Sequence, residues 1–539
     1  MKNQVQLIAY VDRLSGGGFS ELNCLLSGPL AGVFGGVHLL PLFPPIDGAD
    51  AGFDPIDHTQ VDLRLGTWEN VRALGDTVEI VADLIVNHVS SSSPQFLDYS
   101  KNGPASRYAG MFLTFDQVFP QGAHESDIVR IYRPRPSLPF TPVTLLSGEK
   151  KLLWTTFNPQ QVDIDVHHPQ AEAYLESILR KFQAAGIKMI RLDAVGYAIK
   201  KPGTSCFMIP ETFDFISELT SKARALGIEV LVEIHSYYQK QIEIARRVDW
   251  VYDFALPPLV LHALFQRDPR PLARWLAISP RNAVTVLDTH DGIGVIDVGA
   301  DAIGNPGLLE PAQIDNLVET IHQRSRGQSR QATGAAASNL DLYQVNCTFL
   351  DALGGRESEY LIARALQFFA PGIPQVYYVG LLGGGNDMEL LARSGVGRDI
   401  NRHYYQPAEI KTALARPLGQ RQLELMRMRN THPAFAGRME VDVPSDHQIA
   451  ITWRLAPWSK ANLRLTAAGQ SYSTGRDQHW IKLLVDLSIP SAFITGTRPV
   501  KSSPSLLAAP PDSLFHEASP TGELLQMIVG DAAASSVKF

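Results

Sequence analysis

The sequence predicts an α/β fold, namely a (β/α)8 TIM barrel with inserted subdomains after strands 3 and 7 and a C-terminal all-β domain. Three observations support this prediction. The chain contains eight short apolar runs with strand character. They alternate with helix-like segments such as 171–185 and 211–225, as expected of βα units around a parallel sheet. Acids follow four of these runs, and polar residues at the C-terminal ends of barrel strands converge on one site.

The eight runs also locate the insertions. Most neighbouring runs are one helix-sized segment apart, but about 100 residues separate the third from the fourth. The excess, residues 89–167, is rich in Pro, aromatic and turn residues and indicates an inserted subdomain B. A second insertion, residues 292–355, contains the small-residue stretch ATGAAASNLDLYQ, which favours a loop with more than one conformation. The predicted strands are residues 4–11, 36–43, 79–86, 187–193, 228–234, 250–256, 283–289 and 372–379.

The rest of the chain divides into barrel and C-terminal parts. Residues 1–88, 168–291 and 356–435 are expected to build the barrel. After that the barrel pattern stops, and short alternating runs predict a small β domain over 436–500. Residues 501–539 are rich in Ser, Pro and Ala and are expected to form a weakly structured tail.

Composition excludes several classes of protein. Hydrophobic residues make up 45% of the 539 residues and charged residues 19%, which is ordinary globular composition. The net charge of −7 gives no electrostatic case for a nucleic acid or anionic membrane partner. Cys24, Cys206 and Cys347 have neither CxxC nor metal-like spacing, which favours a reduced, cytoplasmic setting. The first apolar run is too short for a signal peptide or a membrane span.

Four motifs carry the candidate chemistry: DLIVNH (83–88), RLDAVG (191–196), VEIH (232–235) and DTHDG (288–292). Each places acids beside an Arg or a His at the end of an apolar run. Alternation along a strand puts Arg191 on the same face as the acid two residues later. Acids gathered in this way at a barrel rim are typical of an active site for α-glycosidic bonds, where one carboxylate acts as nucleophile and another as acid and base.

The four motifs resemble, in order and in strand position, the conserved blocks of the alpha-amylase superfamily, glycoside hydrolase family 13. Further segments narrow the resemblance to the sucrose phosphorylase family within it, over about residues 1–435. These segments are DGADAGFDPIDHTQVD (47–62), YRPRPSLPFT (132–141), QVDID (161–165), PGTSCF (202–207), VYDFALPPL (251–259), GAAASNLDLYQVN (334–346) and GRDINRHYY (397–405).

The resemblance assigns roles at the barrel rim. It implies that Asp193 is the nucleophile, which Arg191 would keep ionised by its opposite charge. Glu233 is implied as the acid and base, so it is expected to carry a proton near neutral pH. Asp291 is implied as the third acid, which favours the oxocarbenium-like transition state. Asn87 and Asp83 are expected to orient the rim. The implied partners of the glucosyl unit are Asp50, Phe53, His88, Arg191, His290 and Arg398.

The leaving-group side is implied to bind fructose and then phosphate. A phosphate dianion needs positive charge and donors, for which the resemblance supplies Arg135 and Tyr343, with His235 nearby. Asp341 would accept hydrogen bonds from the fructosyl unit but repel phosphate, so the loop 332–344 is expected to rearrange between half-reactions. Tyr197 and Gln344 are expected to line the same subsite.

The activity that the resemblance implies is retaining phosphorolysis of sucrose to α-glucose 1-phosphate and fructose, without a metal or organic cofactor. Its partners are those small molecules and inorganic phosphate, and a homodimer is one assembly to expect. Three alternatives stay open: phosphorolysis of sucrose 6′-phosphate or glucosylglycerol, a hydrolase or transglucosidase, and an inactive scaffold. The presence of all three acids argues against the last.

Overall fold

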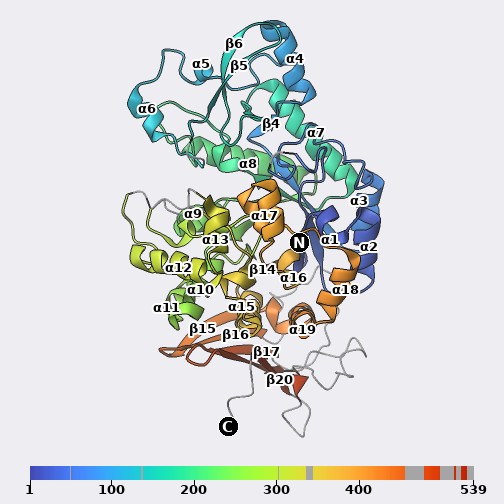
Figure 1. Ribbon diagram of the computed structural model, residues 1–539, viewed down its shortest axis with the longest axis vertical. Helices are drawn as coiled ribbons and strands as arrows, with labels where there is room; N and C mark the ends of the chain where they lie inside the picture. Colours follow the sequence, from blue (N-terminus) through green and yellow to red (C-terminus); the bar gives the residue numbers. More distant parts are fainter. Residues whose placement is uncertain are drawn as a thin grey trace.

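Eight parallel strands close into a barrel at the centre of the molecule (Figure 1). The structure, a computed structural model, describes residues 1–48, 50–134, 137–301, 303–334, 344–455, 479–497, 515–516 and 524–530. All eight predicted strands are present and pair around the ring in the order β1-β14-β11-β10-β9-β8-β3-β2. They are β1 (Gln6–Ala9), β2 (Gly36–Leu39), β3 (Glu79–Ile85), β8 (Met189–Asp193), β9 (Glu229–Val232), β10 (Trp250–Asp253), β11 (Ala283–Thr285) and β14 (Ile373–Tyr377).

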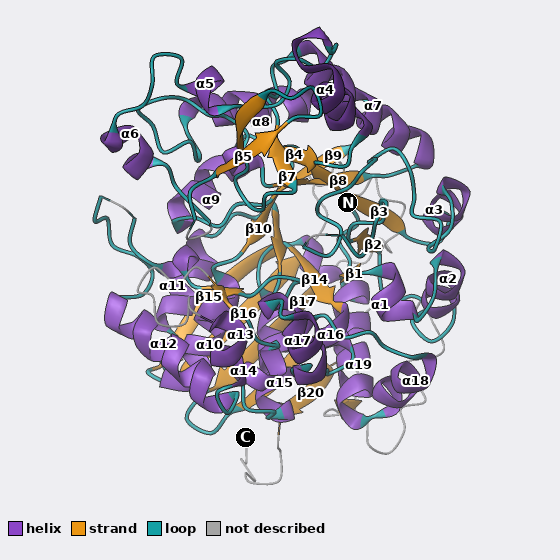
Figure 2. Cartoon of the chain, turned by 45° about the horizontal axis from the view of Figure 1, so that its top comes forward, coloured by secondary structure: helices purple, strands orange, loops and turns teal. Residues whose placement is uncertain are grey.

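Helices surround the barrel and cover the outer faces of its strands (Figure 2). The two helices predicted above are α7 (Pro169–Ala185) and α8 (Pro210–Ala225). Each begins with a proline, whose fixed φ and missing N–H suit the first helical position. The others on the barrel include α1 (Val11–Ser15), α2 (Phe19–Ser27), α3 (Trp68–Gly75), α9 (Tyr238–Ala245), α10 (Leu256–Gln266), α11 (Arg270–Ile278), α15 (Glu357–Phe369), α18 (Pro407–Ala415) and α19 (Pro417–Thr431).

The interior of the barrel is polar beneath its C-terminal rim. Asp83 on β3 accepts a hydrogen bond from Arg191 Nη1 on β8, and its carboxylate lies 3.2 Å from His38 Nε2 on β2. The Tyr252 hydroxyl donates to Gln375 Oε1 at 3.0 Å. All five side chains are buried, and buried polar groups of this kind are stable only when they are paired. The barrel therefore carries a fixed network of polar groups directly below its rim.

The first insertion separates β3 from β8 and stands above the barrel in Figure 1. It contains two antiparallel pairs, β4 with β7 and β5 with β6, and a small apolar cluster that includes Phe119 and Trp154. The boundaries 89–167 stay a prediction. The elements are β4 (His88–Ser90), α4 (Pro94–Asn102), η1 (Gly103–Ala105), α5 (Phe115–Val118), α6 (Glu125–Arg130), β5 (Phe140–Thr144), β6 (Lys150–Trp154) and β7 (Gln161–Asp163).

The second insertion separates β11 from β14 and adds helices and one short ladder beside the rim. In that ladder β12 pairs with β13, and Gly294 lies opposite Gln344. Residues 335–343 lie outside the described part of the chain. The elements here and after β14 are β12 (Ile293–Gly294), η3 (Ile296–Val298), α12 (Pro311–Arg324), α13 (Gln328–Thr333), β13 (Gln344–Val345), α14 (Phe349–Ala352), α16 (Tyr378–Leu381), α17 (Met388–Ser394) and η5 (Gly397–Asn401).

An antiparallel sheet forms the predicted C-terminal all-β domain, in the strand order β15-β16-β17-β18-β20-β19. Trp453 anchors it to the barrel by donating from Nε1 to the Phe369 carbonyl at 2.9 Å. The sheet continues into 501–539, where we expected a weakly structured tail, because β20 pairs with the whole of β18. The strands are β15 (Arg438–Ser445), β16 (Gln448–Leu455), β17 (His479–Asp486), β18 (Ser491–Thr497), β19 (Phe515–His516) and β20 (Leu524–Gly530), and η6 (Pro433–Ala436) precedes them.

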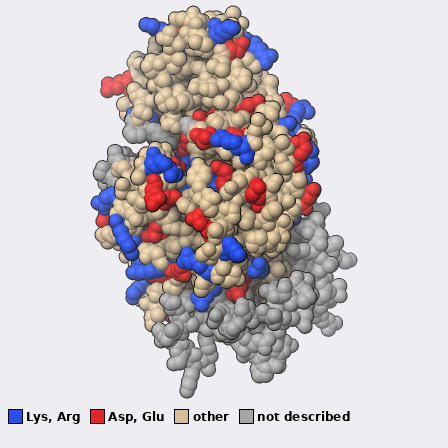
Figure 3. All heavy atoms as spheres, turned by 45° about the vertical axis from the view of Figure 1, so that its right-hand side comes forward, with Lys and Arg blue, Asp and Glu red and all other residues tan. Residues whose placement is uncertain are grey.

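Acidic and basic side chains are interspersed on the face drawn in Figure 3. This mixture agrees with the modest net charge of −7 and does not resemble the basic stripe of a nucleic-acid-binding protein. Among the described helices, none has both the length and the apolar character that crossing a bilayer requires.

Candidate active site

A pocket of about 230 Å³ opens at the C-terminal rim of the barrel. It gathers eleven of the predicted site residues: Asp50, Phe53, His88, Asp193, Tyr197, Glu233, His235, His290, Asp291, Gln344 and Arg398. Arg191 lies beneath them, bonded to two of the acids. Arg135, Asp341 and Tyr343 lie outside the described residues. Further lining comes from Pro134, Phe157, Gln161, Ala194, Gly196, Phe207, Ile234, Thr333 and Asn346.

Arg191 is the centre of the carboxylate cluster. Its Nη1 lies 2.6 Å from Asp83 Oδ1 and 2.9 Å from Asp193 Oδ1, and its Nη2 lies 2.6 Å from Glu233 Oε1. The guanidinium group is 2% exposed, so little water competes with these contacts. Because one planar group binds Asp193 and Glu233 through different nitrogens, it fixes the two carboxylates beside each other at the base of the pocket.

The single positive charge of Arg191 is shared among three carboxylates, which changes the expected ionisation of Asp193. Burial raises the pKa of Asp193 well above its ordinary value; Arg191 opposes this, while Glu233 and Asp83 raise the pKa further. Arg191 therefore lowers the pKa of Asp193 in the expected direction but does not offset burial and the two neighbouring acids.

Asp291 has the opposite environment. Burial would raise its pKa, but Arg398, His290 and Arg402 hold the pKa well below its ordinary value. Arg398 Nη1 lies 2.8 Å from Asp291 Oδ1 and 3.1 Å from Asp50 Oδ2. Arg402, which is fully buried, approaches the same two acids at 3.9 and 3.5 Å. Two arginines thus hold Asp291 and Asp50 as anions on one wall of the pocket.

Aromatic rings form the adjoining wall. Phe53 stacks on His290 with ring centroids 5.0 Å apart and an interplanar angle of 11°. Burial lowers the pKa of His290 to about 3, so this imidazole is neutral at physiological pH. His88 also has a pKa lowered by burial, and its Nε2 lies 2.9 Å from the Phe53 carbonyl. These rings present flat, uncharged surfaces and a few polar edges, which suits a sugar ring.

His235, Gln344 and Tyr197 also line the pocket. Gln344 Nε2 lies 3.2 Å from His235 Nε2. Tyr197 lies on η2 (Val195–Tyr197), directly after β8, and packs among Phe157, Phe207 and Tyr132 at centroid distances of 5.1, 4.7 and 6.2 Å. Gln344 comes from the second insertion and Tyr197 from the turn after β8, whereas His235 follows β9 and pairs with Asp297.

Strained backbone borders the site. Ala194, which follows Asp193, has φ +54°, and Asp50 and Ala51 have φ +52° and +56°. Non-glycine residues adopt the left-handed region only at an energetic cost, and such residues cluster at active sites. Here the turn after β8 aims Asp193 into the pocket, and the turn at 50–51 brings Asp50 to Arg398.

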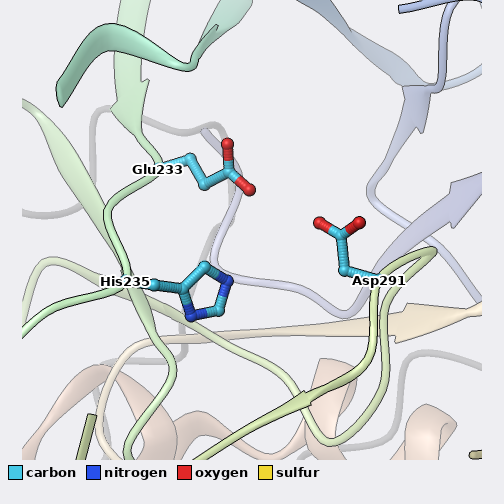
Figure 4. Close-up of side chains that lie close together, drawn as sticks. All are labelled: Glu233, His235 and Asp291. Atoms are coloured by element: carbon cyan, nitrogen blue, oxygen red, sulfur yellow. The ribbon is translucent and has the colours of Figure 1, made fainter. Parts of the chain in front are cut away.

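Glu233, His235 and Asp291 point toward a shared space, with their ligand atoms within 4.8 Å of one another (Figure 4). Each already has a partner: Glu233 pairs with Arg191, Asp291 with Arg398, and His235 Nδ1 with Asp297. The two arginines would repel a cation at this position. Carboxylates neutralised in this way suit a sugar better than a metal ion.

Asn87 does not line the pocket but holds its base. Its Oδ1 accepts a hydrogen bond from Lys200 Nζ at 2.7 Å, and the same ammonium lies 2.7 Å from Asp163 Oδ2 and donates to the Tyr197 carbonyl. Lys200 therefore ties the end of β3, the first insertion and the turn after β8 together with one buried charge. The expected orienting role of Asn87 agrees with these contacts.

Sequence reasoning missed four residues of the site: Arg402, Lys200, Gln161 and Asp297. Arg402 and Gln161 lie inside the quoted segments GRDINRHYY and QVDID, so their polar side chains were available signals. Lys200 and Asp297 lie outside all the motifs and segments quoted above. Their partners lie 113 and 62 residues away in the sequence, and only the fold brings them together.

The barrel and its carboxylates, clustered around a buried arginine at the rim, define a carbohydrate-active enzyme of the alpha-amylase superfamily. The chain matches no family model. It is 63% identical over 477 residues to a sucrose phosphorylase of Agrobacterium vitis, covering 87% of this chain and 98% of that protein. A sucrose phosphorylase of Bifidobacterium adolescentis is 54% identical over 456 residues, covering 84% and 90%. The chain belongs to the sucrose phosphorylase family, which confirms the resemblance seen in its sequence.

A solved structure agrees with this assignment. The sucrose 6F-phosphate phosphorylase from Thermoanaerobacter thermosaccharolyticum superposes with a TM-score of 0.82 at 36% identity, covering 92% of this chain and 96% of that one. The similarity extends over nearly the whole chain, so the predicted fold class, a (β/α)8 barrel with a C-terminal β domain, is confirmed.

Proposed function

We propose that the enzyme catalyses the retaining phosphorolysis of sucrose to α-glucose 1-phosphate and fructose through a glucosyl-Asp193 intermediate. The observation that carries the proposal is the Arg191 contact with both Asp193 and Glu233 at the base of a narrow pocket, in a chain of this family. A retaining mechanism needs such a pair of neighbouring carboxyl groups.

In the first half-reaction the Asp193 carboxylate attacks the anomeric carbon of the glucosyl unit. Glu233 donates its proton to the glycosidic oxygen, the bond to that oxygen breaks, and fructose leaves. The reactive form therefore needs a proton on Glu233 and a carboxylate at Asp193. Arg191 contacts both groups and stabilises the Asp193 carboxylate by a charge-assisted hydrogen bond.

In the second half-reaction phosphate takes the place of fructose. Glu233, now a carboxylate, accepts a proton from the attacking phosphate oxygen while that oxygen displaces Asp193 from the anomeric carbon. Two inversions give net retention, and Glu233 regains the proton needed for the next cycle. Water would compete for the same intermediate, so the aromatic wall that narrows the pocket contributes by excluding it.

Asp291 and Asp50 are proposed to bind hydroxyl groups of the glucosyl unit. Arg398 and Arg402 keep both acids anionic, which makes them strong hydrogen-bond acceptors. An anion beside the anomeric centre also stabilises the positive charge of the oxocarbenium-like transition state. His88, His290 and Phe53 complete this subsite, with Phe53 held by its stack on His290.

The acceptor side is proposed to use His235, Gln344 and Tyr197, together with Arg135 and Tyr343 for phosphate and Asp341 for fructose. The last three rest on the family resemblance alone. If Asp341→Ala improves the affinity for phosphate no more than that for sucrose, the idea that the loop exchanges Asp341 for Arg135 and Tyr343 fails.

A phosphorylated or glycerol-linked glucoside is the second candidate substrate. The structural similarity to a sucrose 6F-phosphate phosphorylase favours it. The negative charge of Asp341 opposes it, because a phosphorylated fructosyl unit would lie close to that acid. The sucrose phosphorylases are also more similar in sequence, at 63% and 54% identity, so unphosphorylated sucrose is the preferred substrate.

Incubation with sucrose, with and without inorganic phosphate, tests the proposal. We expect α-glucose 1-phosphate that depends on phosphate, with little free glucose. Free glucose at the same rate in both reactions would indicate a hydrolase instead. Absence of turnover would overturn the choice of sucrose and direct the assay to sucrose 6′-phosphate and glucosylglycerol.

A homodimer in the cytoplasm is the proposed physiological form, which rests on the resemblance and on cysteine usage. Light scattering of the purified enzyme tests the dimer: a mass equal to one chain would contradict it.

A further inference from the structure

Asp297 lies behind the acceptor end of the pocket and has no role in the mechanism above. It belongs to η3 and is fully buried. Its oxygens accept three hydrogen bonds: from His235 Nδ1 at 2.9 Å, from Gln241 Nε2 at 3.0 Å and from the Ser236 backbone N–H at 3.1 Å. The carboxylate is thus surrounded by donors, and one of them is the ring that lines the pocket.

The charge of this buried acid needs a counterion. Its described contacts include no lysine or arginine, and Gln241 and the Ser236 amide are neutral. Burying a carboxylate without an opposite charge is costly. The His235 imidazole is the group in contact with Asp297 that can become positive.

Gly294 leaves room for the contact between Asp297 and His235. A Cβ atom at Gly294 would lie 2.6 Å from Asp297 Oδ2 and 3.0 Å from His235 Nδ1, so a side chain there would disturb the contact. Gly294 also pairs with Gln344 across the β12–β13 ladder, which places the Gln344 amide 3.2 Å from the other ring nitrogen, Nε2. The ring is therefore held between a buried acid and the pocket.

We infer that Asp297 is a positioning residue that keeps His235 as an imidazolium cation, so that its Nε2 donates a charge-assisted hydrogen bond to the phosphate acceptor. This inference rests on the proposed phosphorolysis. A dianion gains more from a cationic donor than a neutral fructosyl unit does. The Gln344 amide suits both states of the ring, because it can present its oxygen to a protonated Nε2 or its nitrogen to a bare one.

Among the residues that the structure describes, the titratable groups placed against the ring are three acids: Asp297 from η3, Glu233 from the end of β9 and Asp291 from the loop after β11. Phe254, the ring stacked on His235 at 3.8 Å, is uncharged. Burial alone would lower the pKa of His235, but Asp297 and then the other two acids raise it above its ordinary value.

The test is Asp297→Asn, which keeps the shape and removes the charge. We expect the KM for phosphate to rise at least about 10-fold, the size of one charge-assisted hydrogen bond, with a smaller change in the KM for sucrose. The rise of the phosphate KM with pH should begin at lower pH than in the wild type. Phosphate ionises equally in both assays, so the ratio of the two KM values at each pH isolates the enzyme's contribution.

Two further measurements separate this role from a structural one. In a His235→Gln background, Asp297→Asn should add little, because the effect passes through the ring. Gly294→Ala, which crowds the contact and keeps the acid, should raise the phosphate KM in the same direction. An unchanged phosphate KM in Asp297→Asn, or an equal rise with and without His235, would overturn the inference.

The imidazole NMR signals of His235 give a readout that does not need turnover. Their titration midpoint should fall in Asp297→Asn, and an unchanged midpoint would overturn the inference even if the kinetics changed. If the wild type makes no glucose 1-phosphate from sucrose and phosphate, the proposed function fails, whereas the NMR titration still decides whether Asp297 sets the charge of His235.

Discussion

The two ends of the pocket are built differently. At the glucosyl end, Asp193, Glu233 and Asp291 lie at the ends of barrel strands and are held by Arg191 and Arg398 at 2.6 to 2.9 Å. At the acceptor end, His235 and Gln344 are held by short elements of the second insertion and by a single buried acid. The donor site is therefore rigid, and the acceptor site beside it is made from loops. This arrangement allows the same glucosyl-binding site to be used with different acceptors.

The largest effect is expected at the glucosyl end, from loss of the nucleophile. Asp193→Ala should lower kcat by about 10⁵-fold with any acceptor, because both half-reactions pass through this carboxylate. The free energy of unfolding should not fall, since Arg191 keeps its contacts with Asp83 and Glu233. Assays with phosphate and with water, alongside a urea titration, check both parts; activity that survives with either acceptor would contradict the shared donor site.

Lys200 ties the segment after β3 to the first insertion and to the turn after β8, so its loss should affect stability. Its ammonium and Asp163 are 1% and 0% exposed, and Lys200→Met would leave a buried carboxylate without its counterion. We expect the free energy of unfolding to fall by about 3 to 5 kcal/mol. The matched control is Lys201→Met, because Lys201 is 54% exposed in its pair with Glu211. Equal midpoints of urea unfolding for the two variants would show that the buried ion pair stabilises the protein no more than the exposed one does.

Arg398 and Gln344 compare the two ends directly. Arg398→Ala should lower kcat/KM for sucrose and for α-glucosyl fluoride by a similar factor, about 10²-fold, because it removes the partner of a buried acid. Gln344→Ala should change the KM for phosphate or fructose by about 3- to 10-fold, with a smaller effect on glucosyl fluoride. Steady-state kinetics with both donors check this. If Arg398→Ala lowered kcat/KM for only one of the two donors, the division of the pocket into a glucosyl end and an acceptor end would be contradicted.

The last prediction concerns stability in acid and involves Asp83, below the rim. Burial would raise the pKa of Asp83, but His38 and Arg191 lower it to about 2, from an ordinary 3.8. The folded state thus binds fewer protons than the unfolded state, so the stabilisation is present above the ordinary value and is lost as pH falls toward 2. As the pH falls from 3.8 toward 2, the free energy of unfolding should fall by about 2 kcal/mol less in Asp83→Asn than in the wild type. Urea titrations at several pH values measure both slopes, and parallel slopes would contradict the low pKa.

The sequence predicts features that depend on local patterns and misses those that depend on contacts between distant residues. Strand alternation predicts all eight barrel strands and places Arg191 beside Asp193, because period two and a rim of acids are local patterns. The raised pKa of Asp193 could not be predicted, since it depends on burial and on three carboxylates from three strands that share one guanidinium group. Lys200 and Asp297 were missed for the same reason: each looks like an ordinary surface charge until the fold buries it against a distant partner.

Trapping the glucosyl enzyme tests the central claim most directly. In Glu233→Gln, α-glucosyl fluoride can still load the enzyme because fluoride leaves without an acid, while the missing base slows the transfer to phosphate. Mass spectrometry of the digested protein should then find one glucosyl unit on the peptide that contains Asp193. A glucosyl unit on another residue, or none while fluoride is released at a steady rate, would contradict the double displacement through Asp193.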